Sequence, residues 1–157
     1  MINEKAMKVD PGDAAANYNL GCFYHSKGKL SLAEKHLRRA IKLDPKYALA
    51  YAELGQLLAQ RKDRTKEAVS LLQKAIEGDP EDGTSRAYLA NGLWLLRRLK
   101  AAKEQYLKLI ELWPNSPLPY RWYGDFLARE SKDRARAEPY FQMAAEISQA
   151  GGCSIHQ

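Results

Sequence analysis

Apolar side chains recur every three to four residues along most of the chain, in stretches separated by short polar segments. This spacing places them on one face of an α-helix, because a helix completes a turn in about 3.6 residues. The pattern therefore predicts an all-α protein, and we expect no β-strand. The predicted helices span residues 14–27, 30–43, 48–61, 64–78, 83–96, 99–112, 117–130 and 134–149.

Four prolines divide this pattern at nearly equal intervals. Pro11, Pro45, Pro80 and Pro114 follow one another after 34, 35 and 34 residues. Proline has no backbone N–H and clashes with the preceding helical turn, so each one is expected to end a helix. The interval predicts tandem helix-turn-helix units within a single domain over residues 1–157. The expected bounds of the units are about 14–47, 48–82, 83–116 and 117–149.

Small residues recur where the two helices of a unit have to approach closely. Gly21 and Ala33 hold such positions in the first unit, and Gly55 and Ala68 hold them in the second. Short polar residues just before three of the helices can accept hydrogen bonds from free backbone N–H groups, so they are predicted N-caps. These residues are Asp13, Asp82 and Ser116.

The recurring frame resembles the tetratricopeptide repeat family. In the first unit the frame consists of Leu20, Gly21, Tyr24, Ala33, Leu37, Ala40 and Pro45, and the later units repeat it in register. The resemblance extends over residues 14–149 and implies an all-α, right-handed α-solenoid of four tandem repeats. It also implies a partial repeat at the N-terminus, with a remnant helix at residues 2–9, and we expect a flexible tail at residues 150–157.

The sequence departs from the family pattern in three ways. Leu109 stands in the third unit where a small residue is usual. The second and fourth units each carry one extra residue in the turn between their helices. The tryptophan that is usual near the start of the first helix is replaced by Asn17, Tyr51, Arg86 and Tyr120.

In such a solenoid the first helix of each unit lines a concave groove, and the resemblance implies a non-enzymatic protein–protein interaction module. We therefore expect an adaptor, scaffold or assembly factor that binds a peptide or helix of a partner protein. The inward-facing positions of the family, applied residue by residue, give the expected groove. They are Tyr18, Asn19, Cys22, Leu49, Glu53, Gln56, Tyr88, Asn91, Trp94, Leu118, Arg121, Trp122 and Asp125.

Some of these residues have a second interpretation. Packing between repeats is favoured for Tyr18 and Leu49. Binding is favoured for Tyr88 and Trp122, which lie at the same repeat position one unit apart, where a ring has less to pack against.

One class of partner is not expected. Some family members hold the terminal carboxylate of chaperones with lysine, asparagine and arginine side chains. The residues at the matching positions here are Tyr18, Cys22, Glu53, Thr84 and Tyr88. None of them fits, and Glu53 would repel a carboxylate. Arg121 could hold an anionic side chain, but a pair with Asp125 on the same helix face is the favoured interpretation.

The composition is that of a folded protein and limits the other classes. The chain has 157 residues, of which 45% are hydrophobic and 28% are charged. Its longest apolar run, residues 47–52, is too short to cross a membrane. No signal peptide is recognised at the amino terminus, and Cys22 and Cys153 suit a reducing compartment. We therefore expect a cytoplasmic protein.

The net charge of +6 is divided unevenly between two edges of the expected solenoid. Turns within repeats hold thirteen basic and four acidic residues, whereas turns between repeats hold three basic and eight acidic residues. A basic edge suits acidic surfaces or phosphate backbones, so nucleic-acid or polyanion binding is the alternative function. Solubility alone is the favoured explanation of these charges. The basic edge comprises Arg61, Lys62, Arg64, Arg97, Arg98, Lys100, Arg129, Lys132, Arg134 and Arg136.

The last predicted helix offers a third possibility. Its apolar side chains have no following repeat to cover them, so homo-oligomerisation through this helix is an open alternative to cover by the tail. The residues concerned are Tyr140, Phe141, Met143 and Ile147.

No catalytic site, metal or cofactor is expected. The histidines are His25, His36 and His156, and none stands with cysteines at a metal-ligand spacing. No nucleophile, base and orienting group can be brought together from the sequence.

Overall fold

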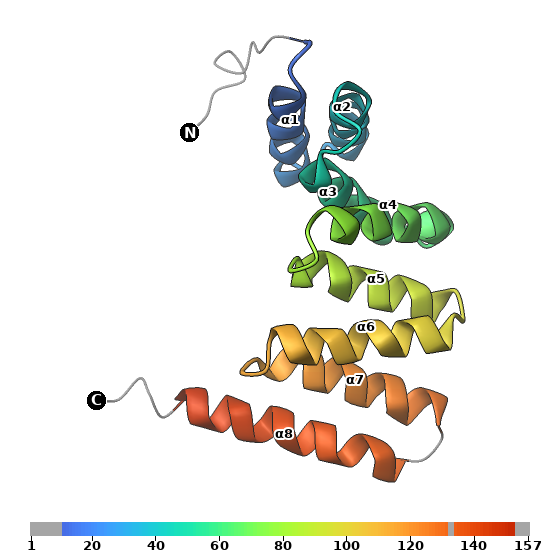
Figure 1. The fold of residues 1–157 in the computed structure, drawn as a ribbon, viewed down its shortest axis with the longest axis vertical. Helices are drawn as coiled ribbons and strands as arrows, with labels where there is room; N and C mark the ends of the chain where they lie inside the picture. The colour runs from blue at the N-terminus through green and yellow to red at the C-terminus, as the bar shows by residue number, and fades with distance from the viewer. Residues whose placement is uncertain (1–10, 132–133, 153–157) are drawn as a thin grey trace.

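The computed structural model describes residues 11–131 and 134–152, which form helices joined by short turns (Figure 1). The elements are α1 (Ala14–Ser26), α2 (Leu30–Leu43), α3 (Ala48–Ala59), the 3₁₀ turn η1 (Lys62–Arg64), α4 (Thr65–Gly78), α5 (Gly83–Leu95), α6 (Leu99–Leu112), α7 (Pro117–Glu130) and α8 (Arg134–Gly152). Over this part of the chain there is no β-strand, so the all-α prediction is confirmed.

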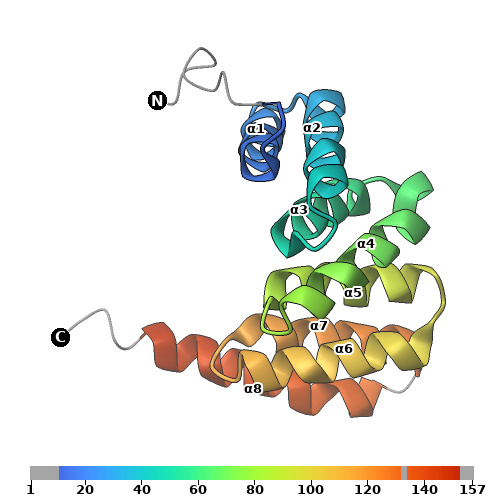
Figure 2. The same cartoon turned by 45° about the horizontal axis from the view of Figure 1, so that its top comes forward.

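The helices stack in chain order along the long axis of the molecule (Figure 1). Each helix contacts its neighbours in sequence, and the direction of the helices changes along the stack, from α1 and α2 at one end to α7 and α8 at the other (Figure 2). This arrangement is the solenoid that the repeat predicts. The expected remnant helix at residues 2–9, and residues 153–157 of the expected tail, lie outside the described residues.

The three predicted N-caps are confirmed. The side chains of Asp13, Asp82 and Ser116 accept hydrogen bonds from backbone N–H groups in the first turns of α1, α5 and α7, at 2.9, 3.0 and 3.4 Å. Two helix ends differ from the expectation by more than one residue. α3 ends at Ala59 because η1 accommodates the extra residue of that turn, and α8 continues past residue 149 to Gly152.

One hydrogen bond recurs in the turn that precedes the first helix of every unit. The side chains of Asn17, Tyr51, Arg86 and Tyr120 donate to the carbonyl oxygen of the proline six residues earlier, at 3.3, 3.0, 2.9 and 3.1 Å. These are the four residues that replace the family's tryptophan. An amide, two phenols and a guanidinium therefore hold the chain between helices in the same way.

The turns inside the first and third units both reverse the chain through a residue in the left-handed conformation. The residues are Gly28, with a φ of 73°, and Arg97, with a φ of 60°. In both turns the N–H of the following residue donates to a carbonyl oxygen five residues earlier, at 2.9 Å. This is the Schellman motif, in which glycine is the usual residue. Arg97 is thus a non-glycine residue in a position that favours glycine.

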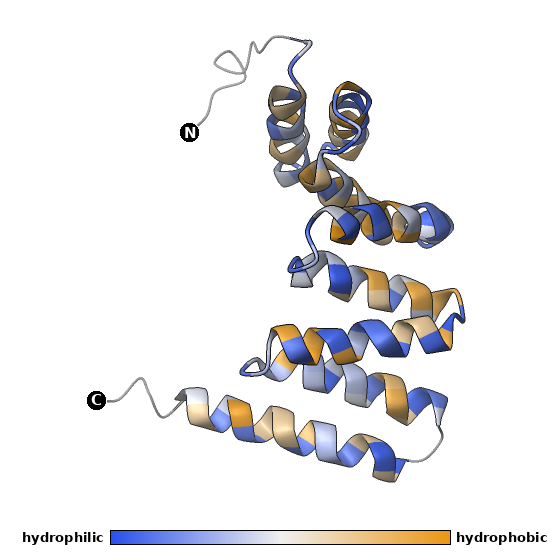
Figure 3. Cartoon of the chain, in the orientation of Figure 1, coloured by the Kyte–Doolittle hydropathy of each residue, from blue (hydrophilic) through white to orange (hydrophobic). Residues whose placement is uncertain are grey.

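The two helices of a unit approach each other at a small residue. A Cβ atom at Gly55 would lie 2.7 Å from Cγ of Leu72, so the contact between α3 and α4 requires glycine. The first and fourth units repeat this contact with Gly21 against Leu37 and Gly124 against Phe141. Apolar residues are distributed along every helix (Figure 3), so the core runs the length of the stack.

The spacing of the first helices changes in the second half of the chain. α1 packs against α3, and α3 against α5, more closely than α5 packs against α7. Leu109 of α6 is fully buried, at the repeat position that Ala40 and Ala75 hold in the first two units. A leucine is larger than an alanine, and the looser packing of α5 against α7 is found in the unit that carries this leucine and the unit that follows.

Candidate functional site

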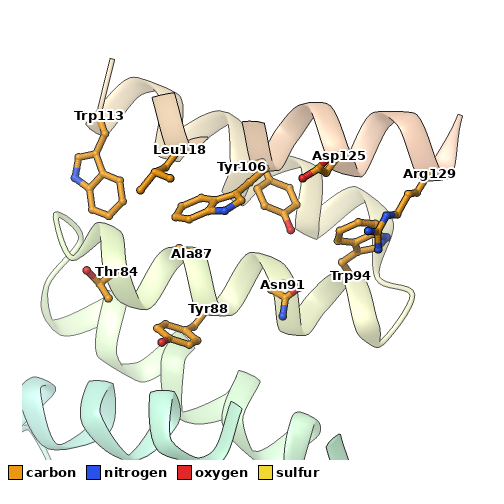
Figure 4. Close-up of a pocket in the computed structure, with 11 residues that line it drawn as sticks. Thr84, Ala87, Tyr88, Asn91, Trp94, Tyr106, Trp113, Leu118, Asp125 and Arg129 are labelled. Atoms are coloured by element: carbon orange, nitrogen blue, oxygen red, sulfur yellow. The ribbon is translucent and has the colours of Figure 1, made fainter. Parts of the chain in front are cut away.

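A pocket of about 630 Å³ lies between α5 and α7, a volume typical of ligand-binding clefts. Tyr106 of α6 and Trp113, just after α6, complete its wall. Figure 4 shows Trp113 and Leu118 at one end, Trp94 and Arg129 at the other, and Asp125 between them. All three tryptophans of the chain line this pocket.

The Trp94 end of the pocket is held in place by hydrogen bonds and ring contacts. The indole N–H of Trp94 donates to Glu130 Oε1 at 2.6 Å, and the same oxygen accepts from Arg97 Nη1 at 2.6 Å. The hydrogen bonds from Arg97 and Trp94 lower the pKa of Glu130. Arg129 lies over the Trp94 ring at 5.4 Å, and Phe126 contacts the ring edge-on. These contacts fix the indole in one orientation.

The opposite end is formed by a tryptophan that the sequence analysis did not identify as functional. The ring of Trp113 lies against the backbone of Gly83 so closely that a Cβ atom there would overlap it. Trp113 stands where the first two units have Asp44 and Asp79, whose carboxylates accept hydrogen bonds within their own turns. The sequence feature that could have identified Trp113 is this replacement of a turn-forming aspartate by an aromatic residue.

The pocket brings together six of the predicted groove residues from the third and fourth units. These are Tyr88, Asn91, Trp94, Leu118, Trp122 and Asp125. Thr84, Ala87, Tyr106 and Trp113 complete the lining without having been predicted, and Arg129 was assigned to the basic edge instead. Arg121 is exposed and does not line the pocket.

The predicted groove residues of the first two units lie outside this pocket, and several contact their own chain. Tyr18 packs against Tyr47 with ring centroids 5.3 Å apart, which agrees with the packing interpretation. Glu53 Oε1 lies 2.6 Å from His25 Nδ1. Gln56 Nε2 lies 3.5 Å from the Ser85 hydroxyl.

The remaining members of this group are more open. Leu49 is 52% exposed, so the packing interpretation of Leu49 is wrong. Asn19 is exposed. Cys22 is half-buried, and burial raises the pKa of its thiol, which disfavours the reactive thiolate.

Asp125 of α7 lines the pocket and forms no ion pair with a described residue. Over the described residues, the carboxylate of Asp125 takes part in no hydrogen bond or ion pair, and Arg121 forms no ion pair with it. The pairing of Arg121 with Asp125 favoured from the sequence is therefore wrong. Burial raises the pKa of Tyr106, and the nearby charge of Asp125 adds to this rise. The charge of the Asp125 carboxylate therefore reaches the Tyr106 hydroxyl in the wall of the pocket.

The basic edge is partly neutralised by the chain's own carboxylates. The ion pairs are Arg61 with Asp63, Arg64 with Glu34 and Glu67, and Arg97 with Glu130. Six further members form no ion pair with the described residues: Lys62, Arg98, Lys100, Arg129, Arg134 and Arg136. Lys132 lies outside the described residues. Three of the ten basic residues of this edge therefore already have a carboxylate partner in the chain.

The last helix leaves part of its apolar surface open. Met143 is 42% exposed, and Tyr140, Phe141 and Ile147 are half-buried. In the described ranges, no group of histidines, cysteines and carboxylates is placed to hold a metal ion. None of the helices described combines the length and apolar character that a bilayer span needs.

Four family comparisons match the chain, and all four describe the same repeat. A family described as "Tetratricopeptide repeat" matches residues 3–35, and another of that description matches residues 48–82. A family described as "TPR repeat" matches residues 23–62, and one described as "TmcB, TPR repeats" matches residues 96–152. The chain belongs to the tetratricopeptide repeat family. The resemblance found in the sequence is thereby confirmed.

Curated relatives are similar over most of this chain but are longer proteins. Protein O-mannosyl-transferase Tmtc1 of Drosophila melanogaster is 31% identical over 72% of the chain, which spans 14% of that protein. Type IV pilus assembly protein PilF of Pseudomonas aeruginosa is 29% identical over 90% of the chain, which spans 56% of PilF.

Solved structures of MamA proteins have the same fold. One crystal structure of MamA superposes with a TM-score of 0.85 and 26% identity, covering 95% of this chain and 86% of MamA. MamA residues 41 to the end from Desulfovibrio magneticus RS-1 superpose equally well, with a TM-score of 0.85 and 20% identity over 94% of this chain and 82% of that one. Together these likenesses support a protein-interaction or scaffold module.

Proposed function

We propose that this chain is a non-catalytic adaptor, scaffold or assembly factor that binds a segment of a partner protein in the pocket between α5 and α7. The observation that carries the proposal is the concentration of aromatic residues there, because all three tryptophans and two tyrosines line one cleft. Tryptophan and tyrosine are enriched among the residues that dominate protein interfaces. Tyr106 is buried, and the other four aromatic residues are half-buried. The proposed binding site therefore includes only the groove residues of the third and fourth units.

A double variant, Tyr88→Ala with Trp122→Ala, tests the proposal. Each truncation is expected to cost about 1–2 kcal/mol of binding free energy, so affinity for a recovered partner falls at least about thirtyfold. Leu95→Ala is the matched control, because Leu95 is 56% exposed on the same helix and does not line the pocket. Binding that survives the double variant, or that is lost in the control, would contradict the proposal.

Polyanion binding along the basic edge is the competing function. It predicts an affinity that decreases steeply with salt and that is lost when Arg98, Arg134 and Arg136 are changed to Gln. Groove binding predicts a weak salt dependence and no effect of these changes. We favour the pocket because three of the ten edge residues already pair with the chain's own carboxylates.

Homo-oligomerisation through α8 makes a separate prediction. The molecular mass in solution would increase with protein concentration, and Met143→Glu would abolish the increase by placing a charge on the exposed apolar surface. A constant monomer mass at all concentrations would exclude this role.

A further inference from the structure

The pocket holds two unpaired charges of opposite sign on one helix. Asp125 and Arg129 both line it and are four residues apart on α7. An acidic residue four positions before a basic one is the favourable order for an ion pair on a helix. No ion pair between the two is formed, and neither charge pairs with another described residue. Both charges therefore remain available to a ligand.

The contact of Arg129 with Trp94 explains why the two charges stay apart. The guanidinium of Arg129 lies 5.4 Å from the centre of the Trp94 ring, which draws the side chain away from Asp125. Trp94 is itself fixed by its hydrogen bond to Glu130 at 2.6 Å. Figure 4 shows Arg129 beside Trp94 at the end of the pocket, with Asp125 nearer its middle.

The lining of the pocket follows a fixed order along α7. Leu118, 43% exposed, stands at the apolar end with Trp113, followed by Asp125 and then Arg129. A helix rises about 1.5 Å per residue, so Leu118 and Asp125 are about 10 Å apart along the axis and Asp125 and Arg129 about 6 Å apart. An extended chain advances about 3.3 Å per residue, and its side chains alternate between two faces. Spacings of four and two residues are therefore the nearest that turn all three side chains of a bound segment toward α7.

We propose that the pocket selects an extended segment of a partner protein in which an apolar residue is followed, four positions away, by a basic residue and, two positions beyond that, by an acidic residue. This inference rests on the proposed function and adds the chemistry of the partner. The bound segment can run parallel or antiparallel to α7, because only the order of its apolar, basic and acidic residues has to match the order of Leu118, Asp125 and Arg129.

Each element of the proposed segment has a defined contact. A lysine or arginine reaches Asp125, and its further N–H donors find the side-chain oxygen of Asn91, which forms no hydrogen bond with any described residue. The faces of Tyr88 and Trp122 attract the same cation. The acidic residue pairs with Arg129, and the apolar residue fills the end formed by Leu118 and Trp113.

Four short peptides of identical composition test the order of charges. The matched peptides are Ac-Phe-Ser-Ser-Ser-Lys-Ser-Glu-NH₂ and its reverse, Ac-Glu-Ser-Lys-Ser-Ser-Ser-Phe-NH₂. The control peptides exchange lysine and glutamate, as Ac-Phe-Ser-Ser-Ser-Glu-Ser-Lys-NH₂ and its reverse. Binding is followed by NMR through the three indole N–H signals of the ¹⁵N-labelled chain, since every tryptophan lines the pocket. We expect one matched peptide to bind about tenfold more tightly than either control peptide, because the exchange turns two attractions into two repulsions.

Variants of the two charges complete the test. Asp125→Asn and Arg129→Gln should each reduce the preference for the matched peptide several-fold. Lys108→Gln and Glu111→Gln each remove one exposed charge from α6, outside the pocket, where the two side chains pair at 2.8 Å, and they should leave the preference unchanged. Circular dichroism of each variant verifies that the helices are retained.

The outcomes separate this inference from the proposed function. Equal binding of matched and control peptides, tighter binding of a control peptide, or no indole shift with any peptide at millimolar concentration would overturn the charge order. The pocket would still be the binding site if Tyr88→Ala with Trp122→Ala abolishes partner binding. If that double variant retains its partner, the proposed function fails, whatever the peptides show.

Discussion

The left-handed residue Arg97 allows backbone strain and an ion pair to be measured separately. A residue with a side chain costs about 1–2 kcal/mol in this conformation, and a glycine there avoids most of that cost. Arg97 also pairs with Glu130 at 2.6 Å, but its side chain is 66% exposed, so solvent weakens this ion pair. Arg97→Ala removes the pair and keeps the strain, whereas Arg97→Gly removes both.

We expect the Arg97→Gly variant to be more stable than the Arg97→Ala variant by about 1 kcal/mol. Because both lack the ion pair, their difference reports the backbone alone. Urea denaturation monitored by circular dichroism measures it, and a chain of this size should show a difference in Tm of about 3 °C.

Replacing Gly28 measures the same backbone strain in the opposite direction, by adding a side chain to a left-handed residue. It has a φ of +73° in the equivalent turn, and a Cβ atom there would have no neighbour within 4 Å. Gly28→Ala should therefore destabilise the chain by about 1 kcal/mol through backbone strain alone. Equal stability of the two Arg97 variants, or an unchanged stability of Gly28→Ala, would refute the assignment of strain to these turns.

Three further changes test the packing and the charges. Gly55→Ala should lower the unfolding free energy by about 1–3 kcal/mol in urea denaturation, since the new Cβ atom would lie 2.7 Å from Cγ of Leu72; an unchanged midpoint would show that α3 and α4 separate freely. Tyr51→Phe should cost about 0.5–1.5 kcal/mol in the same assay, because the carbonyl oxygen in the preceding turn loses its donor at 3.0 Å; a neutral result would mean that water replaces the phenol. Burial alone would raise the pKa of Glu34, but hydrogen bonds from two arginines lower it below its ordinary value of 4.5. The contribution of this carboxylate to stability is therefore present above about pH 4.5 and is lost as the pH falls further. Unfolding measured between about pH 6 and pH 3 should show this loss in the wild type and a smaller one in Glu34→Gln, and parallel curves would contradict it.

The fold could be predicted because its determinants are local and periodic. Apolar spacing locates each helix, and a proline marks each boundary between units. The caps at Asp13, Asp82 and Ser116 were predictable because an N-cap needs only a short acceptor side chain before a helix. The left-handed Arg97 was not predictable, because sequence preference there points to glycine.

The candidate site was predictable only in part. Tyr88 and Trp122 were identified because their repeat positions face the groove. Trp113 was missed because it stands beside the proline that ends a repeat and not at a groove position, although its ring lies against Gly83. The restriction of the pocket to α5 and α7 depends on the spacing of the units, a tertiary property that residue positions in a single unit do not encode.

The bond from each unit's first helix to the carbonyl of the preceding proline has a consequence for how such repeats diverge. Asparagine, tyrosine and arginine occupy one position and satisfy the same acceptor, so substitution there is constrained by hydrogen-donating ability and reach rather than by shape or polarity. Two repeats can therefore look unrelated at this site while remaining interchangeable in a chimeric array. Grafting the segment 83–116 next to a different unit should preserve the junction without any compensating change.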